Sequence, residues 1–502
     1  MKRIIEKFEI PTWLFVVLSI VFILRIPSFF EPYSYGDEMI YLTLGDAIRK
    51  GVPLYSQIHD NKPPLLYLMA AISGSLFVFK AVLALWHIIT VFIFWKLAEA
   101  LYPKNKKFQI AATSVFALLT TIPLLEGNIV NAELFMIGPI ILSFYILLTK
   151  KLSFKTLFVS GMVFSVGALF KIPAIFDIPT IVVLWIVSLK KFSKESLLGI
   201  LKNTLFLSLG VLTPILATCF WFFLNGALSE YIKAAFLQNV GYLSTWRPSD
   251  VQKPFLIKNA PLLIRSGIVF IGVLVLFLKR NLLSKEFIFS TLWLLFSLFA
   301  VTLSERPYPH YLIQSVGPIS LLVGTLFAMQ NFEQLLAIIP LSLASFVPYY
   351  YHFWHYPTFS YYSKFVRFID KNTSKDEYLK TFGQYTQRNY KIASFIVSNT
   401  KPSEKIFVWG DTSTIYALSK RLPPIKFVAD YHIKDFANKE LLFSQMSNNL
   451  PSYIIILPEA EKLEELDAII KNNYAPIENI EGATIMKLLG SKVRALIKYY
   501  SF

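Results

Sequence analysis

Long apolar runs limit most strongly what this 502-residue chain can fold into. They recur through the first 350 residues, and a run of about 18 or more apolar residues can cross a hydrocarbon core of about 30 Å as a helix. The runs are continuous rather than alternating, which excludes a membrane β-barrel. Only 16% of the residues are charged, against about 25% in an average soluble domain. The sequence therefore predicts an all-α polytopic membrane helix bundle over residues 1–350.

We expect about eleven membrane-spanning helices in this bundle. The candidate spans are 12–30, 82–101, 108–125, 133–149, 156–170, 173–189, 203–224, 259–278, 286–303, 311–329 and 334–350. The first one lacks a small-residue cleavage site, so we expect a retained span rather than a signal peptide. Arg25 and Arg265 lie near outer span ends, where we expect them to snorkel to the interface.

Lysine and arginine residues set the expected orientation in the cell (inner or plasma) membrane. They gather near the N-terminus and in the loops 104–107, 150–155, 190–202 and 279–285. If the further apolar stretch 63–79 crossed the bilayer, these loops would face outward, against the positive-inside rule. We therefore expect 63–79 to stay in the outer interface, or to dip in and return, and the N-terminus to be cytoplasmic. The extracytoplasmic loops are then 31–80, 126–132, 225–257 and 304–310.

Composition changes after the last predicted span. Charge rises, and segments with helix and strand patterns alternate: a helix at 385–398, a strand at 405–410, a helix at 413–420, a strand at 451–458 and a helix at 460–473. This alternation predicts a small extracytoplasmic α/β domain over residues 351–502. Its last residues, 491–502, have the basic and aromatic pattern of an interfacial tail.

The net charge of +17 and the single cysteine exclude several classes of function. No nucleic-acid-binding motif accompanies the positive charge, so we interpret it as topology-setting charge and expect no nucleic-acid partner. A lone Cys219 excludes an internal disulfide and a zinc site built on cysteines.

The first outer loop holds an acidic helical pattern, GDEMIYLTLGDAIRKG, at 36–51. Asp37 and Glu38 fall in its first turn, where the helix dipole stabilises negative charge. Tyr41 lies four residues after Asp37 and therefore on the same face. An ordinary capped interfacial helix would show the same pattern, so these residues alone leave the function open.

A basic motif, HDNKPPLLY, follows at 59–67 in the same loop. Pro63 and Pro64 can open a helix, which places Lys62 just before an apolar interfacial segment. A lipid phosphate would lie at that depth. A lysine that merely reaches for headgroups is the alternative.

Together the two stretches resemble a known family, the GT-C glycosyltransferases of the protein O-mannosyltransferase and aminoarabinose-transferase (ArnT-like) type. The resemblance is carried by Asp37-Glu38, Tyr41, Gly51, Tyr55, Asn61-Lys62-Pro63-Pro64-Leu65 and Tyr67. It implies a polyprenyl-phosphate sugar as donor, Asp37 as catalytic base, Lys62 as a phosphate ligand, and Glu38, Tyr41 and Tyr67 as substrate contacts. Met39 and Ile40 depart from the aminoarabinose enzymes, which typically carry a basic residue there, so we expect different substrate contacts.

Elementary chemistry is compatible with this implication. A sugar hydroxyl needs a base to become a nucleophile, whereas a phosphate leaving group needs cations rather than a general acid. One carboxylate and a basic cradle therefore suffice for a single displacement, which inverts the anomeric centre and differs from the two-carboxylate arrangement of glycosidases.

Further candidates lie in later outer segments. Glu133, in EGNIVNAELF, resembles the second-loop carboxylate of the family, or is an acid placed for its helix dipole. Arg306 and His310, in SERPYPHYLIQ, are candidate phosphate ligands, since arginine binds phosphate in bidentate fashion. Lys171 is a candidate phosphate ligand or the ion-pair partner of Asp177. Aromatic residues of the third outer loop could stack on sugar faces or form an interface belt: Tyr231, Phe236, Tyr242 and Trp246.

The sequence thus predicts an integral-membrane hexosyl- or pentosyltransferase. It would move a sugar from a polyprenyl-phosphate donor to an extracytoplasmic glycolipid, glycan or protein. No cofactor is obligatory, although a divalent metal ion at Asp37 and Glu38 stays an open alternative. The rival functions are a transporter or flippase for lipid-linked saccharides and a non-catalytic binder. A transporter favours charges at mid-bilayer and inverted repeats, and neither is evident in the sequence.

Overall fold

The computed structural model describes residues 10–241, 254–436 and 438–500. Within these ranges, seven helices are long and apolar enough to cross a membrane. They are α2 (Thr12–Arg25, continued by a 3₁₀ turn to Phe30), α5 (Leu76–Leu101), α7 (Ala132–Thr149), α10 (Lys194–Leu224), α13 (Phe255–Leu278), α14 (Lys285–Thr302) and α15 (Ile313–Ala328, preceded by the 3₁₀ turn Pro309–Leu312). Helices suit these segments because a bilayer offers no partner for an unpaired backbone amide or carbonyl.

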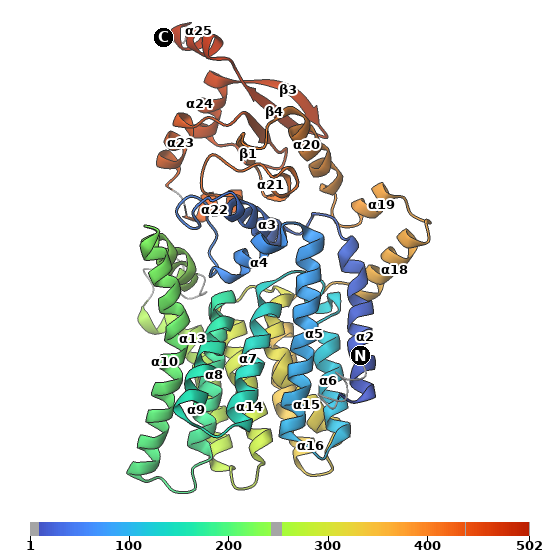
Figure 1. The fold of residues 1–502 in the computed structure, drawn as a ribbon, viewed down its shortest axis with the longest axis vertical. Helices are drawn as coiled ribbons and strands as arrows, with labels where there is room; N and C mark the ends of the chain where they lie inside the picture. Colours follow the sequence, from blue (N-terminus) through green and yellow to red (C-terminus); the bar gives the residue numbers. More distant parts are fainter. Residues whose placement is uncertain (1–9, 242–253, 437, 501–502) are drawn as a thin grey trace.

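The other four predicted spans coincide with shorter helices. These are α6 (Lys106–Leu119), α8 (Phe154–Phe170), α9 (Ile178–Val187) and α17 (Ile338–Tyr350), which follows the short α16 (Glu333–Leu336). Figure 1 shows α6, α8 and α9 running alongside the long helices in one bundle. The predicted positions are thus confirmed as helical, while among the described residues only seven helices are long and apolar enough for a complete crossing.

Helices α10 and α13 carry much of the apolar surface of the bundle. Large side chains on them are exposed, for example Phe220 at 62%, Trp221 at 64% and Phe270 at 68%. Soluble proteins rarely expose contiguous apolar patches of this kind, whereas a hydrocarbon solvent favours them. The chain is therefore a multi-pass membrane protein.

The apolar stretch 63–79 does not cross the bundle, as predicted. Its first part forms α4 (Leu65–Ser73), and nine residues span only about 14 Å at 1.5 Å per residue. Gly74, at φ +69°, ends this helix in the left-handed conformation, and the Ser75 side chain then caps α5. The predicted start of the second span, residue 82, is therefore six residues too late.

The C-terminal domain has a four-stranded sheet in the order β1-β2-β4-β3. Strands β1 (Ile406–Trp409) and β2 (Tyr453–Ile456) are parallel, and β3 (Tyr474–Ile480) and β4 (Ala483–Leu488) complete the sheet in antiparallel fashion. Helices α20 (Thr386–Asn399), α21 (Thr414–Ser419) and α24 (Glu464–Asn473) confirm the predicted helices. The β3–β4 hairpin was missed because four consecutive exposed residues, Pro476 among them, interrupt the strand pattern of β3.

Further α-helices of the described residues are α11 (Leu228–Ile232), α12 (Gln238–Gly241), α18 (Thr358–Ile369), α19 (Lys375–Lys380), α22 (Asp430–Phe436), α23 (Lys439–Asn448) and α25 (Ser491–Tyr500). Helix α25 lies at the end of the C-terminal domain farthest from the bundle (Figure 1), so the predicted interfacial tail is not at the membrane face of the bundle. Helices α3 (Gly36–Arg49) and α4 lie between the bundle and the sheet (Figure 1). The first outer loop therefore joins the two domains.

Candidate active site

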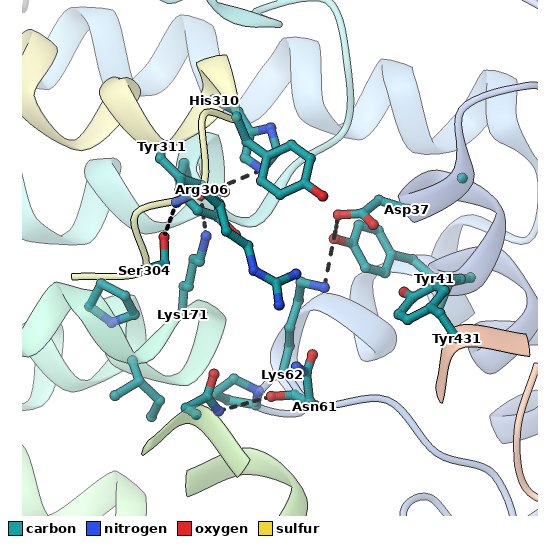
Figure 2. A pocket seen from close by; sticks show the side chains of 18 of the residues that line it. Asp37, Tyr41, Asn61, Lys62, Lys171, Ser304, Arg306, His310, Tyr311 and Tyr431 are labelled. Carbon is teal, nitrogen blue, oxygen red and sulfur yellow. Dashed lines mark hydrogen bonds and ion pairs between the residues drawn. The ribbon is translucent and has the colours of Figure 1, made fainter. Parts of the chain in front are cut away.

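A cavity of about 580 Å³ lies where residues 31–80, the ends of the bundle helices nearest the C-terminal domain, and that domain meet. The sequence-predicted residues that line it are Asp37, Tyr41, Lys62, Glu133, Lys171, Arg306 and His310. Figure 2 shows the side chains of all of these except Glu133, which is not labelled, converging on one space from different elements. Residues separated by more than 250 positions in the sequence are thus brought into one site.

Asp37 lies in the first turn of α3, with its side chain 31% exposed to the cavity. The Tyr41 hydroxyl donates a 2.8 Å hydrogen bond to Asp37 Oδ2, and Lys62 Nζ lies 3.9 Å from the same oxygen. Burial raises the pKa of Asp37, but Lys62, His310 and the Tyr41 hydrogen bond outweigh it, so this pKa lies below its usual range. Asp37 is therefore an ionised carboxylate at neutral pH.

The loop that carries Lys62 is held from behind by two buried tyrosines. Tyr55 donates a 2.8 Å hydrogen bond to the Lys62 carbonyl, and the Lys62 amide donates at 3.1 Å to the Tyr67 hydroxyl. Tyr67 is fully buried and does not line the cavity, contrary to the expected substrate contact. Its place in the structure is that of a support for the Lys62 backbone.

Two further cations face the same cavity. Lys171 forms an ion pair with Glu133, and its ammonium lies 3.8 Å from the centre of the Tyr311 ring. The alternative pair of Lys171 with Asp177 is wrong, because Asp177 accepts hydrogen bonds from Trp293 and Gln314 instead. The Arg306 side chain extends across the cavity toward Asp37 and Lys62 (Figure 2).

His310 lies between two carboxylates. Its Nδ1 contacts Glu126, and its Nε2 lies 3.9 Å from Glu133 Oε1. The Tyr35 hydroxyl donates a 2.8 Å hydrogen bond to Glu126, so the imidazole orientation is fixed from behind. Glu126 itself has a φ of +58°, a conformation uncommon for residues other than glycine.

Glu38 points away from the cavity, contrary to the expected substrate contact. Its carboxylate accepts a 2.6 Å hydrogen bond from the Val130 amide and pairs with Lys80 at 2.9 Å. Burial raises the pKa of Glu38 to about 7, although Lys80 opposes this effect. Asp37 and Glu38 therefore do not form a carboxylate pair for a metal ion. Among the described residues, no group of three or more His, Cys, Asp or Glu side chains could hold a metal ion.

The C-terminal domain contributes cavity residues that the sequence analysis missed. Asp411 and Thr412 follow β1, and Tyr431, His432 and Asp435 come from α22. Because β1 and β2 are parallel, their carboxyl ends share one edge, where ligand sites usually form. The predicted strand at 405–410 was the sequence signal that could have pointed to Asp411 and Thr412, which directly follow it.

Two of the four aromatic residues of the third outer loop that were considered for sugar stacking, Tyr231 and Phe236, pack against protein side chains. Tyr231 is fully buried and stacks on Phe222, with Phe236 packed against its edge. Tyr242 and Trp246 lie outside the described residues.

Comparison with solved structures shows a shared fold. The crystal structure of ArnT from Cupriavidus metallidurans bound to undecaprenyl phosphate matches with a TM-score of 0.59 and 13% identity, covering 95% of this chain and 98% of ArnT. Apo ArnT matches with a TM-score of 0.55 and 12% identity, covering 94% and 97%. The oligosaccharyltransferase AglB from Archaeoglobus fulgidus, in complex with an inhibitory peptide and a dolichol-phosphate, matches with a TM-score of 0.45 and 12% identity, covering 96% and 74%.

Sequence comparisons add one match, in the C-terminal domain. Residues 386–487 match the family described as "Putative competence-induced protein Ccs4 C-terminal domain". No curated protein matches the chain. The likeness to ArnT spans both domains and establishes the GT-C fold over nearly the whole chain.

Proposed function

We propose that this chain, which has the GT-C fold, transfers a sugar from a polyprenyl-phosphate donor to a hydroxyl of an extracytoplasmic glycolipid, glycan or protein. The observation that carries the proposal is that an ionised carboxylate in the first turn of α3, Asp37, faces the same cavity as three cationic side chains. Those cations are Lys62, Lys171 and Arg306. The ArnT structure of the same fold was obtained with undecaprenyl phosphate, a ligand of the proposed donor class.

In the proposed reaction, Asp37 takes the proton from the acceptor hydroxyl as that oxygen attacks the anomeric carbon of the sugar. The bond between the anomeric carbon and the phosphate oxygen breaks, and its electron pair leaves with the polyprenyl phosphate. The proton remains on Asp37 until solvent removes it. One displacement from the face opposite the leaving group inverts the anomeric centre.

The cations act on the departing phosphate, whose negative charge increases as the bond breaks. Fixed cations that face the developing charge stabilise the transition state more than the ground state. Arg306 can present two N–H groups to the phosphate, whereas Lys62 acts as a point charge between the phosphate and Asp37. Glu133 balances Lys171 and can orient a sugar hydroxyl.

The bound donor also prepares the base. In the free protein Lys62 and His310 hold the pKa of Asp37 low, which weakens it as a proton acceptor. A phosphate anion beside Lys62 offsets part of that charge and raises the basicity of Asp37. Proton transfer is then favoured only when the donor is in place.

Transfer by the purified full-length protein in liposomes tests this function. Radiolabelled sugars on undecaprenyl phosphate are offered with a panel of extracytoplasmic acceptors, and nucleotide sugars serve as the control donors. Product from lipid donors alone supports the proposal. Binding of lipid donors without turnover on any acceptor would favour the transporter or the non-catalytic binder.

Removal of Arg306 is expected to weaken donor binding. A hydrogen bond to a charged group contributes about 1.5–3 kcal/mol, so Arg306→Ala should raise the Kd for undecaprenyl phosphate by about tenfold to a hundredfold. Arg367→Ala, an exposed arginine in the last turn of α18, is the matched control and should leave the Kd unchanged. Equal Kd values for Arg306→Ala and the wild type would contradict the role of Arg306.

Tyr41→Phe is expected to change the pH dependence of transfer. The variant loses the hydroxyl that helps to lower the pKa of Asp37, so this pKa should rise. Because the ionised carboxylate is the active form, activity is lost as pH falls through its pKa, and the acidic limb of kcat/KM should move to higher pH. Tyr349→Phe, a tyrosine that is 78% exposed, is the control. If the acidic limb of kcat/KM lies at the same pH in Tyr41→Phe and the wild type, the ionisation of Asp37 does not cause this limb.

A further inference from the structure

A buried carboxylate beside the phosphate-binding lysine has no role in the proposed reaction. Asp60 is fully buried, and its Oδ2 lies 3.6 Å from Lys62 Nζ. We propose that the C-terminal domain positions Lys62 for the lipid phosphate through this carboxylate: His432 of the domain fixes Asp60, and Asp60 holds Lys62. The inference rests on the proposed function and adds Asp60 and His432 as positioning residues.

Both oxygens of Asp60 are engaged. Oδ1 accepts a 2.8 Å hydrogen bond from the Asn61 amide and lies 3.3 Å from His432 Nε2. Oδ2 accepts a 2.7 Å hydrogen bond from the Tyr67 hydroxyl and faces Lys62. Burial alone raises the pKa of Asp60, but Lys62, His432 and Tyr67 together hold it far below its usual range. The carboxylate is therefore charged, fully oriented and unable to turn away from Lys62.

Contacts between the first outer loop and the C-terminal domain hold His432 beside Asp60. The backbone amide of His59 donates a 2.8 Å hydrogen bond to the Lys426 carbonyl, so the loop runs beside the C-terminal domain. The His59 ring packs edge-on against Phe427 and His432, with ring centres 5.1 and 6.0 Å apart. His432 is only 1% exposed, so its position depends on the docked domain.

The position of Lys62 depends on a balance between two carboxylates. Its ammonium lies 3.6 Å from Asp60 Oδ2 and 3.9 Å from Asp37 Oδ2. A lysine side chain loses rotamer entropy when it is fixed, and Asp60 fixes Lys62 before the donor arrives. If Asp60 were free to rotate, Lys62 would move toward Asp37 and away from the phosphate. Docking of the C-terminal domain is therefore part of building the phosphate site.

Binding of undecaprenyl phosphate to the full-length protein in nanodiscs tests this inference. His432→Ala should raise the Kd by about tenfold, because Asp60 loses one charge-assisted partner. His432→Gln keeps an N–H donor within reach of Asp60 and should recover most of the affinity. His355→Ala, an exposed histidine outside the cavity, is the matched control. Should His432→Ala fail to fold, His432→Asn replaces it, because its shorter amide does not reach Asp60.

The decisive comparison is made in the Lys62→Met background. If His432 acts through Lys62, His432→Ala should add no further loss of affinity there, whereas a general loss of structure would lower the affinity in both backgrounds. An unchanged Kd in His432→Ala, or the same tenfold loss with and without Lys62, would overturn the inference. Absence of binding by the wild-type protein would instead overturn the proposed function.

Discussion

Asp37→Asn is expected to lower kcat for sugar transfer by about 10² to 10⁴-fold, the range that a positioned general base contributes. Asparagine keeps the size of the side chain and can still meet the Tyr41 hydroxyl and Lys62, but it cannot take the acceptor proton. Donor binding should persist, because the phosphate ligands are unchanged. The measurement is kcat with a lipid-linked sugar, together with the Kd for undecaprenyl phosphate.

Asp376→Asn is the matched control for this variant. Asp376 is exposed in the first turn of α19, outside the cavity, so its replacement should leave both quantities unchanged. A kcat within a few fold of the wild type in Asp37→Asn would remove Asp37 from the base role. Loss of donor binding in Asp37→Asn would assign it to the phosphate site instead.

Lys80→Met is expected to lower the free energy of unfolding by about 3–5 kcal/mol, the usual cost of a buried charge that loses its partner. Lys80 is 1% exposed and pairs with both Glu31 and Glu38, which are 4% and 1% exposed. Its ammonium also donates to the Asn128 carbonyl at 3.0 Å. Methionine would leave two neighbouring carboxylates buried without a cation, and Glu38 directly follows Asp37. The variant should therefore be less stable, and Asp37 should be displaced from its position in the cavity.

Lys96→Met is the matched control on the same helix. Lys96 pairs with Glu99 at the surface, with side chains 23% and 39% exposed, and such pairs contribute at most about 1 kcal/mol. Thermal unfolding in detergent should separate the two variants. Equal transition temperatures for Lys80→Met and Lys96→Met would contradict a structural role for the Lys80 network.

The sequence predicted the helices well because apolar length is a local property. Each of the eleven predicted spans coincides with a helix, and the largest error is at the start of α10, which begins at Lys194, nine residues before the predicted residue 203. Charge in the loops also supported the argument that 63–79 is not a separate span; the stretch contains the short helix α4 and the first turn of α5. These signals need no knowledge of distant contacts.

The sequence identified several residues of the candidate cavity but not the ion pairs that they form. Asp37, Lys62, Lys171, Arg306 and His310 share one cavity, as expected for groups on one face of the membrane. The partner of Lys171 was not predictable, since Glu133 is 38 residues away while Asp177 is six. Proximity in sequence favoured the wrong partner.

Buried polar contacts were the main source of error. The partner of Glu38, Lys80, lies at the start of a long apolar helix, and the sequence offered no reason to pair them. Arg25 was expected to snorkel, yet it is 1% exposed and donates to His87 and to the Thr120 carbonyl. Arg265 was also expected to snorkel to the membrane interface, but it forms an ion pair with Glu305. Such contacts depend on helix packing, which periodicity does not encode.

The anomeric configuration of the product tests the central claim most directly. That claim is that one carboxylate and a cationic cradle carry out a single displacement on a polyprenyl-phosphate sugar. The measurement is the NMR coupling of the anomeric proton in product made from a lipid donor of defined configuration. The account predicts inversion, with product formation by Asp37→Asn slowed by about 10² to 10⁴-fold. Retention of configuration would require a second nucleophile in the cavity and would contradict it.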